Sequence, residues 1–508
     1  MRYILLILLL STSIYSKTFS FEYVDKMPFS REKDYYIWRF LSQSTTTKSQ
    51  AIKIIKGAKA LNKKLKKAYI KKTGYYPTLS KPKPKKPTKA QKKAWAKKVE
   101  KSKKIKKSIH PIEALLKEEA DMQTFIFNSA SKKEREKFNH ILTPKQYQKL
   151  TRSKAFNKSI KIIKKEKLKY IAKSFLFAPA LKNALTYSTL FDLGLNAIKN
   201  NKSDIAILYF GEARKKAYRS NLKDQASFWL YLITREKLYL KSLINSKDIN
   251  IYTLLARDKA HLHYPQNIII PKLKAYRVDN FDITSPIDWA KLKEKIFDES
   301  VDQAKLGNSF ASIETVSLYS YIHARRTKYQ RHYFPMPYRN ILNKLPKKRQ
   351  ALIYAIARQE SRFVPASIST SFALGMMQIM PFLVEDIAKK KNQKIDLDDM
   401  FNPYKALEYA NFHLDYLTKW LYNPLFVAYA YNGGIGFTKN LLITQKLFQN
   451  KNYEPFMSIE LVPVQETKEY AKNVLTNYVI YLNKLGVKIR ISQLLKDVKE
   501  AKNVDRFR

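Results

Sequence analysis

The chain lacks cysteine altogether and has little glycine and little negative charge. Its 508 residues include no Cys, 10 Gly and 42 Asp or Glu, against 97 Lys or Arg. Without cysteine, a disulfide scaffold, thiolate zinc sites and a cysteine nucleophile are excluded. Few glycines among many Lys, Leu, Ile, Ala and Tyr favour helices over β-sandwiches and barrels. At 45% hydrophobic and 13% aromatic, the chain is too apolar to be disordered throughout, and its length predicts two to four domains.

A helix needs about 20 apolar residues to cross a bilayer, and no apolar run in this sequence approaches that length. A short one, residues 4–10, follows Met1-Arg2-Tyr3 and precedes a stretch of small residues that ends at Ser16. This pattern is typical of a secretory signal peptide. We expect residues 1–16 to be cleaved near Ser16 and the protein to be exported to the periplasm. The alternative is an N-terminal apolar strand or helix that stays in the fold.

The positive charge is large and uneven, with a net value of +55. Residues 53–107 contain 23 Lys and one acid, Glu100, whereas residues 351–508 contain 21 basic and 15 acidic residues. Only 20 of the basic residues are Arg, the side chain that reads guanine edges and phosphates, so we expect no nucleic-acid partner. Two interpretations stay open: a solvated arm, since like charges repel, or electrostatic contact with an anionic wall or membrane surface.

Composition and helical spacing divide the chain after the signal peptide into four parts. Residues 17–110 are basic and rich in Lys and Pro, and the Lys–Pro alternation at 81–87 predicts a linker or exposed insertion. Residues 111–340 predict successive helices with short breaks, an α-solenoid or superhelical domain with its connecting segment. Residues 341–490 form a second domain, and 491–508 a C-terminal tail. The clearest predicted helices of the solenoid are 181–199, 204–217, 225–240 and 251–260.

One segment of the second domain places a carboxylate on an apolar helix face. The stretch 350–363 has helical periodicity, and four residues share one face: Ile353, Ile356, Ala357 and Glu360. Pro365 follows closely, so Glu360 lies in the last turn, where the helix dipole is negative. Desolvation and the dipole both raise a carboxyl pKa, and a carboxylic acid that stays protonated can act as a general acid. The alternative is a Glu that reaches solvent or pairs with Arg358 or Arg362.

Three downstream sequence blocks support the role of Glu360 as a general acid. They are residues 369–381, which end Gly-Met-Met-Gln-Ile-Met-Pro, residues 428–434, Ala-Tyr-Ala-Tyr-Asn-Gly-Gly, and residues 459–474. With Glu360-Ser361, these blocks resemble the catalytic domain of the soluble lytic transglycosylases, whose fold is similar to goose-type lysozyme. Residues 226–229, 252–258 and 334–338 are similar to the helical, ring-forming N-terminal domain and connecting segment of that family. The resemblance implies an all-α chain, a superhelical domain followed by a lysozyme-like, predominantly helical catalytic domain.

The resemblance also implies roles for individual residues. Glu360 matches the catalytic acid and base, and Tyr431 a tyrosine that hydrogen-bonds the catalytic carboxyl. Glu460 matches a second groove carboxylate that contacts substrate and is not a nucleophile. The further residues implied to line the saccharide groove are Ser369, Gln378, Met380 and Asn432. Two positions depart from the family pattern, Met376 and Gly433, and neither bears on the chemistry.

The implied reaction is non-hydrolytic cleavage of the β-1,4 bond between N-acetylmuramic acid and N-acetylglucosamine in bacterial peptidoglycan. It gives 1,6-anhydro ends and serves cell wall turnover, with no cofactor and no metal. One alternative is a lysozyme-like hydrolase that uses Glu360 with water and a second carboxylate, for which the candidates are Asp396, Asp398, Asp399 and Glu460. Another is a basic wall-binding protein without activity.

Overall fold

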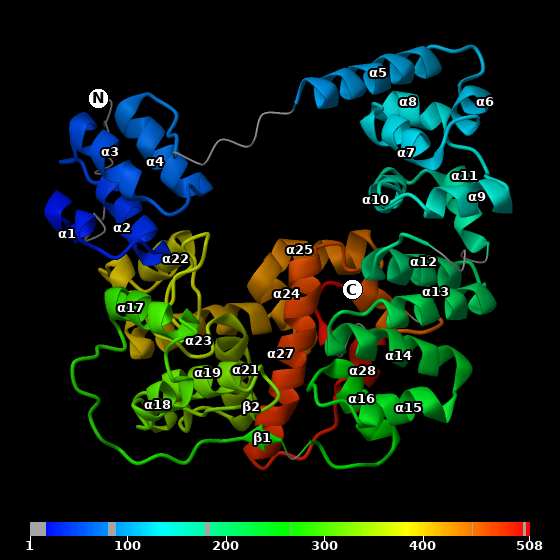
Figure 1. Cartoon of the computed structure of the whole chain (residues 1–508). Coiled ribbons are helices and arrows are strands. Elements are labelled where there is room, and N and C mark those ends of the chain that lie inside the picture. The colour runs from blue at the N-terminus through cyan, green and yellow to red at the C-terminus, as the bar shows by residue number, and fades with distance from the viewer. Residues whose placement is uncertain (1–16, 80–87, 178–182, 266, 450, 501–503) are drawn as a thin grey trace, which may run out of the picture. The chain divides into compact units, whose positions relative to one another are not determined.

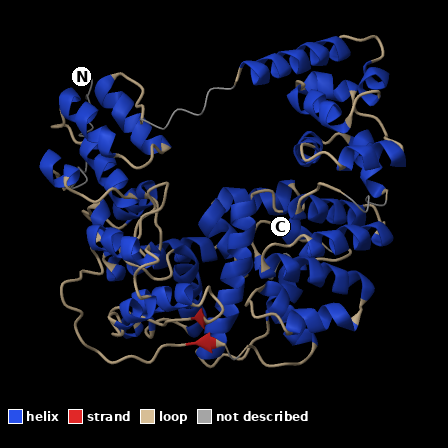
Figure 2. Cartoon of the chain, viewed as in Figure 1, coloured by secondary structure: helices blue, strands red, loops and turns tan. Residues whose placement is uncertain are grey.

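The computed structural model describes residues 17–79, 88–177, 183–265, 267–449, 451–500 and 504–508, and its regular secondary structure is almost entirely helical (Figures 1 and 2). The predicted all-α class is confirmed. Strand structure within these ranges is one short parallel pair, β1 (Ile268–Ile269) with β2 (His332–Tyr333). Over the same ranges, no helix combines the length and apolar character needed to cross a membrane. The predicted signal peptide, residues 1–16, and the Lys–Pro run at 81–87 lie outside the described residues.

The chain forms two compact units. One contains residues 1–81 and 263–508, and the other contains residues 82–262. The predicted boundaries at 110/111, 340/341 and 490/491 do not coincide with this division, and as limits of functional domains they stay a prediction. In particular, residues 17–79 of the predicted basic region belong to the same unit as the predicted catalytic domain.

The first unit begins with a module of short helices, which we call the N-terminal module (residues 17–79). Side-chain caps start its main helices, because Ser30, Thr47 and Asn62 each accept a hydrogen bond from the first turn. Its longest helix is buried along most of its length and packs against α1 (Phe21–Asp25), α4 (Lys63–Thr73) and α17 (Pro286–Phe297). Its elements are α1 (Phe21–Asp25), α2 (Arg31–Ser42), α3 (Lys48–Ile54), η1 (Ile55–Gly57) and α4 (Lys63–Thr73).

A second group of helices precedes the catalytic segment of the same unit. It comprises α17 (Pro286–Phe297), α18 (Gln303–Asn308), α19 (Val316–Arg326) and α20 (Arg339–Leu342). Two buried residues just after Glu360, Val364 and Ala366, join the apolar core of this group. The core residues that these helices and their loops supply are Trp289, Leu292, Ile296, Phe310, Leu318 and Ile322.

The remaining helices of the first unit form the predicted catalytic domain around one long buried helix. This helix, α27, packs against α21 and α24 (Figure 1). The elements are α21 (Lys347–Glu360), α22 (Pro381–Lys390), η3 (Leu397–Phe401), α23 (Pro403–Thr418), α24 (Pro424–Gly433), α25 (Ile435–Lys439), η4 (Asn440–Thr444), α26 (Phe456–Leu461), α27 (Gln465–Lys484), α28 (Ile491–Lys496) and η5 (Asp497–Lys499). The predicted tail is part of this body, since Ile491, Leu495 and Val504 are buried.

The second unit is a succession of helices in which neighbours along the chain pack together, as predicted for a helical array. Three of the predicted helices correspond to α12, α13 and α16, with Leu181 and Lys182 of the first outside the described residues. The predicted helix 225–240 is instead two, because Arg235 takes a left-handed conformation after α14. Gly194 lets α12 approach α13, since a Cβ there would lie 2.6 Å from the Phe210 ring.

The elements of this second unit are α5 (Lys89–Lys106), α6 (Pro111–Leu116), α7 (Ala120–Ser129), α8 (Lys132–Lys137), α9 (Pro144–Thr151), α10 (Phe156–Glu166), α11 (Lys169–Lys173), η2 (Ser174–Leu176), α12 (Tyr187–Lys199), α13 (Ser203–Lys215), α14 (Ser220–Thr234), α15 (Lys237–Ile244) and α16 (Ile251–Lys259).

Candidate active site

Glu360 is the last residue of α21, as the periodicity predicted. The face below it is fully buried, since Ile353, Ile356 and Ala357 have at most 1% of their surface exposed. After Glu360 the chain leaves the helix abruptly, through Arg362 and Phe363 in left-handed conformations. The carboxyl group therefore projects from the end of a rigid, buried helix rather than from a loop.

The surroundings of Glu360 favour its protonated form. Burial raises the pKa of this carboxyl to about 8, with a smaller raising contribution from the negative charge of Glu466. The ion pairs with neighbouring arginines that the alternative required do not form. Arg358 donates instead to Asn477 Oδ1 at 2.7 Å, and Arg362 lies over the Tyr329 ring. Among the described residues, no cation pairs with Glu360, so no positive charge offsets the effect of burial on its pKa.

One hydroxyl group does contact the carboxyl, and it belongs to Tyr470 on α27. Tyr470 Oη donates to Glu360 Oε1 at 2.7 Å, a bond that favours the ionised form and lowers the pKa against the effect of burial. The expectation that Tyr431 makes this bond is wrong, because Tyr431 Oη donates to the backbone oxygen of Met377 at 2.9 Å. Tyr470 lies in the fourth sequence block, but only the packing of α27 on α21 brings its hydroxyl to Glu360, and no local sequence pattern marks it.

The loop that follows Glu360 is closed by its own polar side chains. Ser361 Oγ donates to the carbonyl of Met376 at 2.8 Å, and Ser369 Oγ accepts from the backbone N–H of Ala373 at 2.9 Å. Gln378 Nε2 donates to the carbonyl oxygens of Ser367 and Gly375, at 3.1 and 2.7 Å. These bonds give Ser369 and Gln378 a structural task in this loop. Their predicted contact with saccharide stays a prediction.

Glycine is required at position 375 of this loop. Its φ is +71°, and a Cβ there would lie 2.0 Å from the carbonyl oxygen of Met400. A side chain would therefore push the loop away from η3 and disturb the two bonds of Gln378.

The structure places the other predicted groove residues in different surroundings. Met380 caps the N-terminus of α22 and is partly exposed. Asn432, at the end of α24, accepts a hydrogen bond from Thr467 Oγ1 at 2.7 Å through its side-chain oxygen. The carboxylate of Glu460 has 1% of its surface exposed and lies 3.6 Å from Lys472 Nζ and 3.8 Å from Lys468 Nζ. Contact of these three with substrate stays a prediction.

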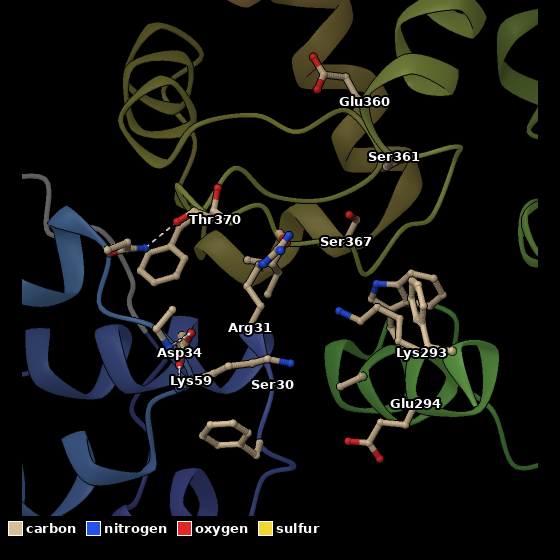
Figure 3. Close-up of a pocket in the computed structure, with 18 of the residues that line it drawn as sticks. Ser30, Arg31, Asp34, Lys59, Lys293, Glu294, Glu360, Ser361, Ser367 and Thr370 are labelled. Carbon is tan, nitrogen blue, oxygen red and sulfur yellow. Dashed lines mark hydrogen bonds between the residues drawn. The ribbon is translucent and has the colours of Figure 1, made fainter. Parts of the chain in front are cut away.

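A cavity of about 780 Å³ opens beside Glu360 (Figure 3). Three separate parts of the first unit line it: the N-terminal module, helix α17 with Tyr321, and the segment 359–372. Of the predicted site residues, only Glu360 lines this cavity. Its charged lining residues are Arg31, Asp34, Lys59, Lys293, Glu294, Glu360 and Arg362.

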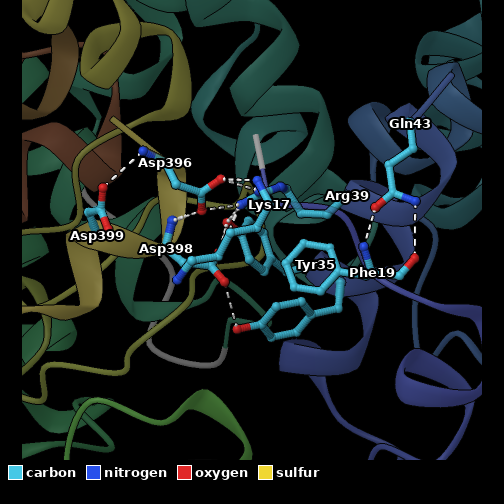
Figure 4. Close-up of polar contacts among 9 residues, drawn as sticks. Lys17, Phe19, Tyr35, Arg39, Gln43, Asp396, Asp398 and Asp399 are labelled. Carbon is cyan, nitrogen blue, oxygen red and sulfur yellow. Dashed lines mark hydrogen bonds and ion pairs between the residues drawn. The ribbon is translucent and has the colours of Figure 1, made fainter. Parts of the chain in front are cut away.

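The aspartates considered as second carboxylates have another role (Figure 4). Arg39 of α2 pairs with Asp396 at 2.6 Å and with Asp398 at 2.8 Å, with 4% of the Arg39 side chain exposed. Tyr35 Oη also donates to Asp398 at 2.8 Å, and Asp399 accepts from the backbone N–H of Asp396 at 2.9 Å. These contacts fasten the N-terminal module to the segment around η3, and none of the three aspartates lines the cavity.

In the parts of the chain that the structure describes, no cluster of three or more His, Asp or Glu side chains could hold a metal ion.

Comparison with known proteins agrees with this geometry. Residues 340–453 match the family model described as Transglycosylase SLT domain. Over these residues the chain is similar to the transglycosylase SLT domain. The soluble lytic murein transglycosylase of Salmonella typhimurium is 27% identical over 222 residues, 41% of this chain and 33% of that protein. That of Escherichia coli K12 is 25% identical over 240 residues, 46% of this chain and 36% of that protein. The chain therefore spans about a third of the length of these relatives.

The likeness of the fold extends beyond the SLT domain. The 70-kDa soluble lytic transglycosylase in complex with bulgecin A matches with a TM-score of 0.50 and 16% identity, over 91% of this chain and 82% of that one. The resemblance inferred from the four sequence blocks is confirmed. The family model ends at residue 453, so Glu460 and Tyr470 lie beyond the matched part of the SLT domain. Helix α27 nevertheless supplies the hydroxyl that contacts Glu360.

Proposed function

We propose that this protein is a lytic transglycosylase that cleaves peptidoglycan between N-acetylmuramic acid and N-acetylglucosamine without consuming water. The observation that carries the proposal is Glu360: a carboxylic acid at the buried end of α21 that lines the cavity, is protonated at neutral pH and accepts a hydrogen bond from one hydroxyl. The relatives named soluble lytic murein transglycosylase support the same reaction.

In the first half of the reaction, Glu360 acts as the general acid. It donates its proton to the oxygen of the β-1,4 bond as the bond to C1 of the muramic acid breaks. N-acetylglucosamine leaves as an alcohol, and an oxocarbenium-like centre develops at C1. A pKa of about 8 suits this step, because the carboxyl group is protonated at neutral pH and can still release its proton.

In the second half, the same group acts as the base. The ionised Glu360 removes the proton from the C6 hydroxyl of the muramic acid, and O6 attacks C1 to close the 1,6-anhydro ring. Glu360 is thereby protonated again for the next cycle. Tyr470 stabilises the carboxylate between the two halves, since its hydroxyl donates to Oε1.

A hydrolase would need a second carboxylate close to the scissile bond. The four candidates considered from the sequence are engaged elsewhere: the three aspartates in the network of Arg39, and Glu460 with two lysines. The other cavity carboxylates, Asp34 and Glu294, come from the N-terminal module and α17. Asp34 already accepts the backbone N–H groups of Lys59 and Ala60.

Mass spectrometry of the muropeptides released from purified sacculi tests the proposed reaction. We expect the wild-type protein to release products that are one water lighter than hydrolysis products and have no reducing end. Glu360→Gln, which keeps the size of the side chain but cannot donate a proton, should release none. Products with reducing ends would identify a hydrolase, and no release by the wild-type protein would indicate a wall-binding protein.

We further propose that the protein is exported to the periplasm and that its excess of lysine holds it on the anionic wall. The lysines of α5 suit this role best. Nearly all of the helix is exposed, Trp95 with 61% of its surface, and its lysines have few acidic partners among the described residues. Peptidoglycan carries carboxylates on its peptide stems, so the attraction is electrostatic and depends on salt.

A further inference from the structure

The cavity beside Glu360 is lined on one side by cations that no step of the proposed reaction uses. We propose that Arg31 and Lys59 bind a carboxylate of the peptide stem of the substrate. The inference rests on the proposed function and adds to it a site for the non-sugar part of peptidoglycan. The two residues belong to the N-terminal module, outside the SLT domain.

Arg31 is the central group of this site. It is the first residue of α2, it is exposed, and its side chain projects toward the loop that carries Ser367 and Thr370 (Figure 3). The only hydrogen bond of its side chain to the described residues is a long one, 3.5 Å from Nη1 to the carbonyl oxygen of Ile368. A guanidinium group in this position keeps donors for a planar anion such as a carboxylate.

Lys59 supplies a second positive charge from the same wall. Its backbone N–H donates to Asp34 Oδ1, which fixes the main chain, while the ammonium group lies 5.9 Å from the centre of the Phe29 ring. Within the described ranges, Lys59 forms no ion pair with a carboxylate. Lys293 on the opposite wall differs, because its ammonium pairs with the buried carboxylate of Glu32.

The two walls are held in place around these cations. The pair between Lys293 and Glu32 joins α17 to α2, and Asn62 Nδ2 donates to the carbonyl oxygen of Thr370 at 2.8 Å. The first contact fixes the far wall and the second fixes the loop after Glu360. A site with fixed walls loses little conformational entropy when a charged ligand enters.

The charge balance of the cavity favours an anion. Three carboxyl groups line it, but Glu360 is protonated at neutral pH and Asp34 accepts two backbone N–H groups. The two other carboxylates are Asp34 and Glu294. The cations that line the cavity are Arg31, Lys59 and Arg362, in addition to Lys293, which is paired with Glu32. Apolar side chains such as Trp289 and Phe372 line the same space and strengthen the attraction by excluding water.

The structure of the proposed substrate brings a peptide stem with carboxylates close to this cavity. Each peptide stem branches from the muramic acid whose C1 is attacked, so a stem must lie near Glu360 and off the axis of the glycan. The cavity extends from Glu360 to a wall that the catalytic helices do not form. A stem that enters it brings its carboxylates to Arg31 and Lys59.

The test compares the double variant Arg31→Gln/Lys59→Gln with the wild-type protein on three soluble substrates. These are glycan fragments with native stems, the same fragments with their carboxyl groups converted to amides, and strands from which the stems have been removed. We expect kcat/KM to fall about tenfold to a hundredfold on native fragments. On amidated fragments and on stem-free strands, the variant and the wild-type protein should be equal.

The control variant is Lys291→Gln/Lys295→Gln. It removes two exposed lysines from the wall helix α17 that do not line the cavity, so it should match the wild-type protein on every substrate. An equal loss by the cavity variant on stem-free strands would overturn the inference, because the cations would then contact the glycan or its lactyl carboxylate. No loss on native fragments would overturn it as well. If the wild-type protein cleaved none of the three substrates, the proposed function itself would fail.

Discussion

At the scale of single residues, the proposed chemistry depends on Glu360 and on the hydroxyl that faces it. The helix end, the buried face and the raised pKa could all be predicted from the sequence, because each follows from local spacing. The hydroxyl that contacts Glu360 could not be predicted from the sequence. Tyr431 and Tyr470 both lie near the site, and the packing of α27 on α21 decides that Tyr470 makes the bond.

Replacement of Tyr470 by Phe tests this assignment. The bond from Tyr470 lowers the pKa of Glu360, so its loss should raise that pKa further and slow the step in which the carboxylate forms. Glu360 acts as an acid while protonated, so activity declines as pH rises through about 8 in the wild-type protein. In Tyr470→Phe, kcat should fall about tenfold to a hundredfold, and the alkaline limb of the pH–rate profile should move to higher pH.

Tyr431→Phe is the matched control for that profile. It removes a hydroxyl that donates to the carbonyl of Met377, so the alkaline limb should keep its position whatever happens to kcat. A shift in Tyr431→Phe, with none in Tyr470→Phe, would reverse the assignment.

The raised pKa of Glu360 also predicts how stability depends on pH. The folded protein keeps this proton up to about pH 8, whereas an unfolded Glu loses it near 4.5, so the folded state binds more protons in that window. Stability must therefore fall as pH rises from about 4.5 to 8. Glu360→Gln removes this cost and should be more stable than the wild-type protein by up to about 5 kcal/mol at pH 9.

Urea unfolding at pH 4 and pH 9 measures the effect. At pH 4 both states of the wild-type protein carry the proton, so the two proteins should have nearly equal free energies of unfolding. A constant difference at both pH values would show that the carboxyl is not buried in its acid form.

At the scale of helices, long-range contacts account for what the sequence did not predict. The predicted helix 225–240 ends early because Arg235 turns left-handed, which no composition signal marks. Residues before 80 were read as part of a basic region because lysine dominates their composition. Yet α2 buries Tyr35, Ile37 and Phe40, and its Arg39 pairs with aspartates more than 350 positions away. Pairs so distant in sequence leave no local pattern.

Arg39→Met tests the attachment of the N-terminal module. The change leaves the carboxylates of Asp396 and Asp398 buried without their cation, and a broken buried pair of this kind typically costs about 3–5 kcal/mol. We expect the free energy of unfolding to fall by that amount at pH 7.

The triple variant that adds Asp396→Asn and Asp398→Asn is the control, since it removes the unpaired charges together with the arginine. It should recover at least about 1 kcal/mol of the loss. If Arg39→Met alone has no effect on unfolding, the network does not fasten the module.

At the scale of the whole molecule, composition predicted the helical class and the four blocks predicted the kind of catalytic domain. The organisation into units was not accessible in the same way, because the N-terminal module and the catalytic helices lie far apart in sequence. The charge of +55 was evident from the start, and the structure adds where part of it is exposed: the lysines of α5.

Neutralisation of α5 tests the proposed adhesion to the wall. A variant with Gln at Lys92, Lys93, Lys97 and Lys98 removes four exposed positive charges from a helix that contributes few buried residues. Its binding to isolated sacculi in low salt should be weaker than that of the wild-type protein, and the dependence of binding on salt should be less steep. Equal binding at every salt concentration would end the proposal.

The central claim is that one carboxyl group performs both proton transfers and that water takes no part. Digestion of sacculi in water enriched in heavy oxygen tests it most directly. We expect the released muropeptides to carry 1,6-anhydro ends with no heavy oxygen at C1 of the muramic acid. Incorporation of heavy oxygen at that carbon would show that water attacks it, and the account of Glu360 as the single acid and base would be wrong.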